Sequence, residues 1–389
     1  MRAELLERYR SLALPTTRDE HWRFTDLKGF DPDAWSAAPA SPAAAPADAF
    51  VDLDASGIAT LDETGVTIVS APEGVRFEPL TDAEPLIGSL VRPDDKLRAH
   101  NAAAWEHGLL VHVAPGVELE RPLFLRATST ADGGSLLWRV LVVAEPGARF
   151  TLVQELSSAS PELAGYANAV VEVVVRDGAK VEFVDVQNLS ERTWLFSSNH
   201  ARVERDAELD WVVGGFGSAK GKVWIQNDLV DRGATSRVTG AYFADGTQHL
   251  DYDTYQLHAA PDTESDFAFK GALRDAARTV WRGMIRVEEG AQRTNAYQEN
   301  RNLLLSKSAM ANSIPGLEIL ANDVRCTHGA TLSQVDREQL FYLMARGLPR
   351  SEAERLIVRG FFQDVLDRVE LEPVREALGA ALEARIPQA

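Results

Sequence analysis

The sequence contains a single cysteine, Cys326, among 389 residues. One cysteine cannot form an internal disulfide, and alone it cannot supply the several thiolates that a structural zinc site or a stable iron–sulfur cluster takes. Basic residues are also comparatively few, since 40 Lys and Arg stand against 58 Asp and Glu and give a formal net charge of −18. A chain this acidic is repelled by nucleic acid and by anionic membrane surfaces, so we expect neither as a partner.

Long apolar runs are missing too. No stretch approaches the roughly 18 apolar residues that a membrane span requires. The N-terminal sequence MRAELLERYRSLALP places Glu4 and Glu7 among its apolar residues, which is unlike a secretion signal. We therefore expect a cytoplasmic protein without a membrane partner.

Sequence signatures of common enzymes are absent as well. The stretch 217–223 comes closest to a phosphate-binding loop, but its glycine spacing is wrong and no hydroxyl residue follows its lysine to hold magnesium. We find no G-x-S-x-G elbow and no H-E-x-x-H helix. Because carboxylates are abundant in so acidic a chain, no acid–base pair can be selected from the sequence, and we assign no catalytic residue.

The composition divides the chain into three regions. These are an N-terminal helical and mixed segment over 1–90, a β-rich core over 91–315, and a C-terminal segment with a helical domain over 316–389. In the first region, apolar residues at helical spacing predict a short amphipathic helix over 2–12. The Ala- and Pro-rich stretch 36–48 predicts a flexible linker.

The β-rich core carries a recurrent turn. Similar turn sequences, each ending in alanine, occur at 145–148, 176–179, 205–207, 231–234, 274–276 and 288–291. The intervals between their alanines are 31, 28, 27, 42 and 15 residues, which are close to multiples of 14. A turn that recurs between short strands is typical of a β-solenoid, in which each coil buries its apolar side chains by stacking on the next. A β-sandwich with regular turns is the alternative.

The last part of the chain returns to helical signals. Asp336 is expected to cap a helix that Gly347 ends. Ser351 and Glu354 form a predicted capping box for a second helix, and Pro373 begins a third. The apolar faces of these helices either pack on one another or leave one face for a partner, and the sequence leaves both interpretations open.

The short segment 323–331 brings together two side chains that can carry chemistry. In an extended strand Cys326 and His328 point to the same side, since residues two apart share a face. A thiol and an imidazole suit iron, zinc or copper, and they also suit sulfur transfer or a nucleophile–base pair. A buried thiol beside a hydrogen-bonded histidine is the structural alternative.

Several longer motifs surround this pair in a fixed order. They are PGLEI at 315–319, DVRCTHGAT at 323–331, and EQLFYL at 338–343 followed by Arg346-Gly347, with Trp281-Arg282-Gly283 and NLLLS at 302–306 upstream. Together they closely resemble the C-terminal signature of the SufB/SufD family. The stretch EHWRFTDL at 20–27 is similar to the N-terminal motif of the same family. The resemblance is strong over about 279–369 and faint between its N-terminal motif and that region.

Two positions favour the SufD type within this family. SufB-type chains carry a cysteine where this chain has Glu299 and a glutamate where it has Gly329, and they often have additional N-terminal cysteines. The resemblance therefore implies a SufD-type chain and not the scaffold that receives persulfide sulfur.

The resemblance implies a mainly β fold, a right-handed parallel β-helix with an N-terminal α-containing segment and a C-terminal helical domain. It implies a non-catalytic subunit that pairs with a SufB-type sister chain and docks the ABC-type ATPase SufC, which hydrolyses the ATP. A transient iron–sulfur cluster, or iron, is then shared with the partner chain and not held stably by this chain alone. Cys326 and His328 are the residues expected at that interface, and the residues expected to dock the ATPase are Leu340, Phe341, Tyr342, Arg346, Gly347 and Phe361.

Two other functions remain open at this stage. A homodimeric β-solenoid that only scaffolds other proteins or delivers iron predicts a stable partner complex, but no effect of substituting Cys326 or His328. A β-helix enzyme that acts on polysaccharide is the third interpretation, and the missing secretion signal disfavours it.

Overall fold

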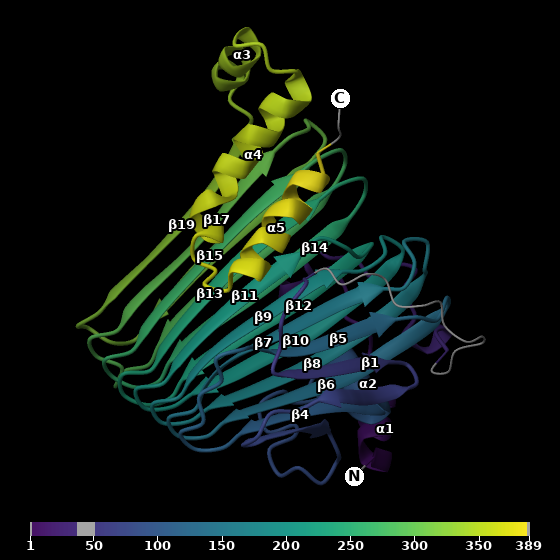
Figure 1. Cartoon of the computed structure of the whole chain (residues 1–389), viewed down its shortest axis with the longest axis vertical. Helices are drawn as coiled ribbons and strands as arrows, with labels where there is room; N and C mark the ends of the chain where they lie inside the picture. Colours follow the sequence, from purple (N-terminus) through teal and green to yellow (C-terminus); the bar gives the residue numbers. More distant parts are fainter. Residues whose placement is uncertain (1, 37–50, 387–389) are drawn as a thin grey trace.

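The computed structural model describes residues 2–36 and 51–386, and it is built around two long β-sheets that face one another (Figure 1). Within these residues, ten strands form one sheet, in the spatial order β19 (Arg325–Gln334), β17 (Asn295–Leu304), β15 (Glu264–Leu273), β13 (Thr235–Ala244), β11 (Glu208–Gly215), β9 (Lys180–Asn188), β7 (Arg149–Ser158), β5 (Leu123–Ser129), β1 (Gly57–Asp62) and β2 (Gly65–Ser70). Nine strands form the other, in the order β18 (Met310–Ile319), β16 (Arg278–Val287), β14 (His249–His258), β12 (Lys220–Leu229), β10 (Thr193–Val203), β8 (Gly165–Val175), β6 (Gly134–Ala144), β4 (His107–Val113) and β3 (Val75–Pro79).

The chain alternates between the two sheets from β4 to β19. Each strand from β6 to β17 pairs in parallel with the strands two before and two after it, so that β10, for example, lies between β8 and β12. Antiparallel pairing occurs only at the first end of the described stack, where β2 pairs with β1 and β3 with β4. This arrangement is a parallel β-solenoid, which confirms that prediction and excludes the β-sandwich.

The strands extend from Gly57 to Gln334, so regular strands lie on both sides of the range 91–315 expected for the core. Of the linker expected at 36–48, all but Ser36 lies outside the described residues.

The recurrent turn explains the regular coil length. Gly147, Gly178 and Gly233 adopt positive φ angles of 72°, 65° and 74°, and Asp206 takes the same place with 52°. Such backbone angles favour glycine and are tolerated by aspartate. The alanine after each of these residues is fully buried at the start of the next strand. The intervals of 42 and 15 residues arise because the turn at 274–276 lies at the other end of a coil, between β15 and β16.

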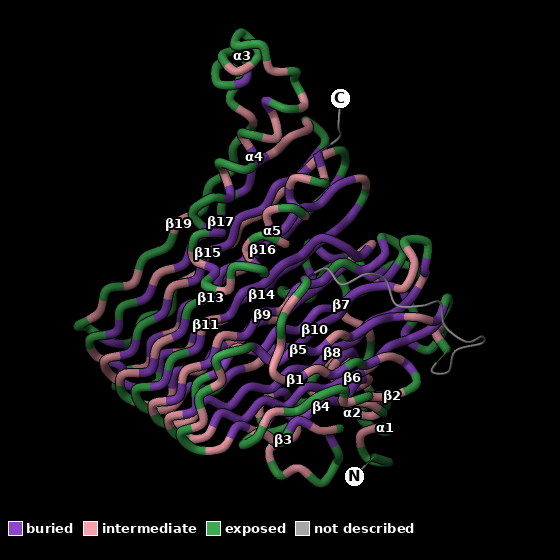
Figure 2. Tube along the Cα trace, in the orientation of Figure 1, coloured by how far each residue is buried: buried purple, intermediate pink, exposed green. Residues whose placement is uncertain are grey.

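The interior of the solenoid is filled by stacked side chains from both sheets. Its largest members, Trp138, Trp211 and Trp281, are fully buried, as are most residues of the valine-rich strand β8. Strands that are buried on both faces are typical of a parallel sheet covered on both sides. Figure 2 shows this burial running through the middle of the stack.

Each sheet is covered on its outer face by helical segments. The nine-stranded sheet is covered by α2 (Lys96–Ala104), on which α1 (Arg2–Ser11) packs, and by residues 20–35, where Trp22 and Phe30 pack against Tyr166 and Phe196. The ten-stranded sheet is covered by α4 (Arg350–Leu366) and α5 (Glu372–Ala384), while α3 (Arg337–Ala345) extends beyond the strand ends (Figure 1). The three predicted C-terminal helices are therefore present.

The predicted capping box at the start of α4 is wrong. The helix begins at Arg350 after Pro349, and no side chain caps it. Glu354 instead accepts a hydrogen bond from Nε of Arg350 at 2.8 Å, and the buried Ser351 hydroxyl has no hydrogen-bond partner among the described residues. An ion pair one turn apart competes for the carboxylate that the capping box needs.

Candidate functional site

The last coil of the solenoid carries Cys326 and His328 on the same strand, β19. In the parallel register with β17, Cys326 lies beside Ala296 and His328 beside Gln298. Cys326 packs against a small apolar cluster that includes the buried β16 residue Ile285. Its side chain therefore faces the inside of the coil, and His328, two residues further along, shares this face. The structure confirms that the two residues share one face of a strand.

The two side chains differ in their surroundings. Cys326 is half-buried, and this partial burial raises the pKa of its thiol. His328 is exposed and makes no hydrogen bond or ion pair within the part of the chain that the structure describes. An imidazole without a partner at the mouth of a coil is free to coordinate a metal ion or to exchange a proton.

The coil that holds this pair is open on its far side. No described strand pairs with the outer edges of β18 and β19, so their backbone N–H and C=O groups are available along two neighbouring edges. Figure 2 shows exposed residues along β19, in contrast to the buried strands of earlier coils. Free edges of this kind accept strands from another chain.

Apolar side chains that the next coil would cover are exposed at this end. Leu317 and Ile319 follow the register of the buried Ile285 and Val287 on β16, yet they are 36% and 39% exposed. On β19, Leu332 is 55% exposed. The open end therefore combines free strand edges with an apolar surface. This combination is typical of a surface that another chain covers.

Gln298 joins the two sheets next to His328. Its Nε2 group donates hydrogen bonds to the backbone oxygens of Gly316 on β18, at 2.9 Å, and of Gly283 on β16, at 3.2 Å. This fully buried amide holds β18 and β17 at a fixed separation where the coil ends. The sequence analysis missed Gln298, because the signal for it is a buried polar residue at an inward strand position, which only the register reveals.

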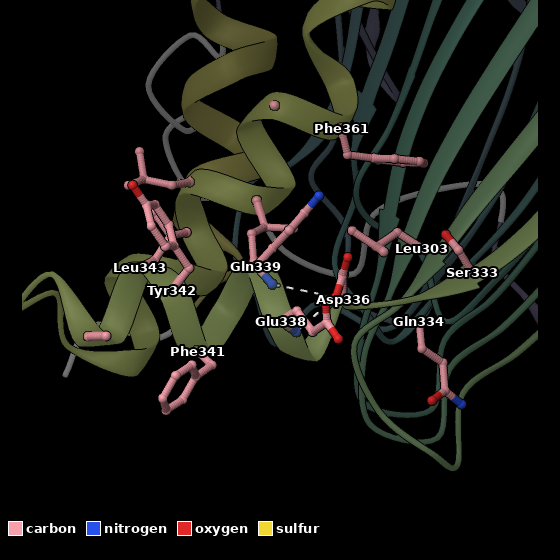
Figure 3. A pocket seen from close by; sticks show the side chains of 14 residues that line it. Leu303, Ser333, Gln334, Asp336, Glu338, Gln339, Phe341, Tyr342, Leu343 and Phe361 are labelled. Carbon is pink, nitrogen blue, oxygen red and sulfur yellow. Dashed lines mark hydrogen bonds between the residues drawn. The ribbon is translucent and has the colours of Figure 1, made fainter.

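A groove of about 1140 Å³ lies between α3, α4 and the ends of β17 and β19. In Figure 3, Phe361 and Leu303 face the space between the helices and the sheet, whereas Phe341 points away from the strand ends. Asp336 also lines the groove, and it caps α3 by accepting a hydrogen bond from the backbone N–H of Glu338 at 2.8 Å.

The residues expected to dock an ATPase are distributed around this groove. Phe341, Tyr342 and Phe361 line it. Leu340 is a buried residue of α3. Arg346 and Gly347 follow the exposed C-terminal end of that helix and do not line the groove. Phe341 and Tyr342 are 74% and 58% exposed, so α3 presents an unusually apolar outer surface.

No group of three or more His, Cys, Asp or Glu side chains in the described ranges is placed to hold a metal ion. None of the described helices is long and apolar enough to cross a membrane.

A comparison with models of protein families shows to which family this chain belongs. The profile described as "SUF system FeS cluster assembly, SufBD core domain" matches residues 126–361, which include most of the solenoid, Cys326, His328 and the residues that line the groove. The chain belongs to the SufBD family. As a SufBD protein it takes part in iron–sulfur cluster assembly by the SUF system, as an assembly protein of a family that generally serves as a scaffold.

Individual SufBD relatives cover most of the chain. A SufBD family protein of Mycobacterium tuberculosis is 30% identical over 382 residues, which span 95% of this chain and 89% of that protein. A SufBD family protein of Mycobacterium leprae is 29% identical over 324 residues, 81% of each chain. The iron–sulfur cluster assembly protein SufD of Bacillus subtilis is 29% identical over 303 residues, 75% of this chain and 67% of SufD.

Proposed function

We propose that this chain is a SufD-type, non-catalytic subunit of an iron–sulfur cluster assembly complex in the cytoplasm. It pairs through its open last coil with a SufB-type sister chain, and it docks the ATPase SufC on the groove beside α3. Clusters form as a transient product at the seam between the two solenoids. ATP is hydrolysed in SufC, and this chain contributes Cys326 and His328 to the seam and the docking groove to the ATPase.

One observation carries the proposal: Cys326 and His328 share the inner face of a coil that no described strand closes. A second solenoid that continues the two sheets covers both side chains and brings its own residues against them. Two donor side chains are fewer than a cluster takes, so we assign the remaining ligands to the sister chain. Glu299 in place of the cysteine of SufB-type chains supports the division of roles.

The groove supports the second contact of the proposal. It is lined by the exposed Phe341 and Tyr342 and by the half-buried Phe361, and it lies close to the open coil. It lies in the region where this chain most closely resembles the SufB/SufD signature. An ATPase subunit seated there is joined to the strand that bears Cys326 and His328.

The test compares three complexes purified without oxygen from the chain's own cells: the unmodified chain, His328→Ala, and Thr327→Ala as a matched control. Thr327 is the exposed neighbour of His328, with its side chain on the outer face of the same strand. We expect all three to recover the SufB-type chain and the ATPase. We expect cluster yield, measured as iron and sulfide per complex, to be lost in His328→Ala and kept in Thr327→Ala.

Two results contradict the proposal. Recovery of the chain as pairs of copies, without the ATPase or a sister chain, favours the homodimeric scaffold. Normal cluster yield from a complete complex that bears His328→Ala, or from one that bears Cys326→Ser, favours a structural role for that residue.

A further inference from the structure

A small cavity of about 20 Å³ lies between the two sheets in the middle coils of the solenoid. On the nine-stranded sheet it is bordered by one inward row of register partners, which are Trp138, Ala169, Ser197, Val223 and Tyr252. The row has a large aromatic ring at each end and three short side chains between them. The cavity arises at this place because the three short side chains do not fill the space that the two rings define.

The facing row on the ten-stranded sheet places a carboxylate at the cavity. Gln154, Asp185 and Val213 are register partners on β7, β9 and β11, and all three line it. Nε2 of Gln154 donates to Oδ1 of Asp185 at 3.0 Å, which is the one side-chain hydrogen bond of Asp185 within the part of the chain that the structure describes. The second carboxylate oxygen is therefore available to a ligand in the cavity.

A hydroxyl group reaches the cavity from the opposite sheet. Tyr252 of β14 lines the cavity and is only 2% exposed, and its hydroxyl makes no hydrogen bond to any residue that the structure describes. This hydroxyl lies against Gly215 of β11, so the ring spans the interior from one sheet to the other. A buried hydroxyl without a partner is costly, which points to a ligand that accepts its hydrogen bond.

Two further polar groups border the same space. Oε1 of Gln154 is buried and has no hydrogen-bond partner among the described residues. The hydroxyl of Ser197 donates to Oδ1 of Asn199 at 3.0 Å, and its oxygen can still accept a second hydrogen bond. The cavity wall thus offers acceptors from both sheets and one donor.

Size and charge select the ligand. A cavity needs about 10–15 Å³ of such space to hold a water molecule, so this one has room for one water. The carboxylate of Asp185 repels an anion. A divalent metal ion takes six or more oxygen ligands, whereas Asp185 is the one carboxylate on the wall. Water can donate to the carboxylate and accept from the hydroxyl at the same time.

We infer that this cavity is a binding site for one water molecule, which donates a hydrogen bond to Asp185 and accepts one from the hydroxyl of Tyr252. The water joins β9 of the ten-stranded sheet to β14 of the nine-stranded sheet through the interior. In the last coil, the amide of Gln298 joins the two sheets in the same way. The inference is independent of the proposed function, since neither Cys326 nor the groove contributes to this site.

A crystal structure of the unmodified chain, determined with and without xenon pressure, tests the site directly. We expect a density peak at hydrogen-bonding distance from Asp185 and from the hydroxyl of Tyr252, and no xenon in its place. A dry cavity binds an apolar gas atom. Xenon in the cavity, a cavity without density, or a peak that anomalous scattering identifies as a metal ion each overturns the inference.

Two alanine substitutions on β8 test the same site in solution. Ala169→Val adds methyl groups at the cavity wall. Ala167→Val is the matched control, because Ala167 is a buried residue two positions earlier on the same face of the strand and does not line the cavity. Oxygen-17 relaxation dispersion counts the long-lived internal waters of each protein, and thermal unfolding gives its melting temperature.

We expect Ala169→Val to hold one long-lived water fewer than the unmodified chain and to melt at a lower temperature, because the displaced water leaves Asp185 and Tyr252 without a partner. We expect Ala167→Val to keep the full number of waters, whatever overpacking does to its melting temperature. An unchanged number of waters in Ala169→Val together with a higher melting temperature shows that the methyl groups fill a dry cavity, and this result overturns the inference.

Discussion

Glu299 and Gly329 are direct partners in the register of β17 and β19, although 30 positions separate them in the sequence. Both lie on the outer face of the last coil, opposite to the face of Cys326 and His328. Glu299 accepts hydrogen bonds from the hydroxyl of Tyr297 and from Nε of Arg301, both at 2.9 Å. The two positions on which the expectation of a SufD-type chain rests therefore form one local surface.

Substitutions at Gly329 test this arrangement. A Cβ atom there would lie 3.6 Å from the Tyr297 hydroxyl and 3.7 Å from Cβ of Glu299, which are ordinary contacts. We expect Gly329→Ala to keep the free energy of unfolding within about 0.5 kcal/mol. Gly329→Glu sets two carboxylates side by side and is expected to lower it by about 0.2–1 kcal/mol at low salt. Urea unfolding at two salt concentrations measures both, and equal stability of the two variants at low salt contradicts the expected repulsion.

Leu332 tests the open end as a binding surface. Because this side chain is already 55% exposed, Leu332→Lys is expected to change the free energy of unfolding by less than about 0.5 kcal/mol. In a covered seam the buried ammonium group is costly, so we expect loss of the SufB-type chain in co-purification. Val69→Lys on β2 is the matched control, since Val69 is 62% exposed at the other end of the stack. Equal recovery of the sister chain with both variants argues against this seam.

The backbone of Leu189 approaches Gly217 so closely that this position requires a glycine. A Cβ atom at this position would lie 2.0 Å from the backbone oxygen of Leu189, which cannot move aside as a flexible side chain could. We expect Gly217→Ala to lower the free energy of unfolding by at least the ~1–3 kcal/mol typical of overpacking. At Gly290 an added Cβ meets nothing within 4 Å, so Gly290→Ala serves as the control. Thermal unfolding of both variants checks the difference, and equal melting temperatures refute it.

Asp185 predicts a measurable pH dependence of stability. It faces the inside of the coil, where burial raises its pKa to about 6 despite a hydrogen bond from Gln154 at 3.0 Å. The folded state holds the carboxyl proton of Asp185 more tightly than the unfolded state. Ionisation of this carboxyl therefore lowers the free energy of unfolding by an amount that is absent below about pH 4, grows up to pH 6 and stays constant above. We expect Asp185→Asn to be more stable than the unmodified chain by about 3 kcal/mol at neutral pH, and equally stable near pH 4.

Urea unfolding from about pH 4.5 to pH 8 measures this difference. Burial lowers the pKa of His100, His249 and His258 to about 4, so both proteins lose stability in acid. That loss is common to both and cancels when the two curves are subtracted. A difference that does not vary with pH shows that Asp185 is ionised to the same extent in both states.

The solenoid could be predicted because its signal is local and repeated. The turn needs a residue with positive φ followed by a small buried one, and Gly178-Ala179 or Asp206-Ala207 records this directly in the sequence. The pairing of Cys326 with His328 on one face follows equally from the two-residue period of a strand. Helix positions at the C-terminus followed from apolar spacing.

Other features depend on contacts that sequence spacing does not encode. That Cys326 faces inward, and that the coil around it is open, follows from the register of β17 with β19 and from where the stack ends. The capping box failed because Arg350 offers Glu354 a charged partner within the same helix. Gln298 acts between sheets, so its role appears only when β16, β17 and β18 are placed together.

The two ends of the stack differ in a way that limits the size of any assembly. At the first end the direction of the chain reverses in β2 and β3, and Val66, Ile68 and Val75 pack onto the core. At the other end the sheets stop with their edges free. In a pair of solenoids joined by their open ends, β2 and β3 lie at this chain's extremity and run opposite to their neighbours, so a further coil does not continue the parallel ladder there.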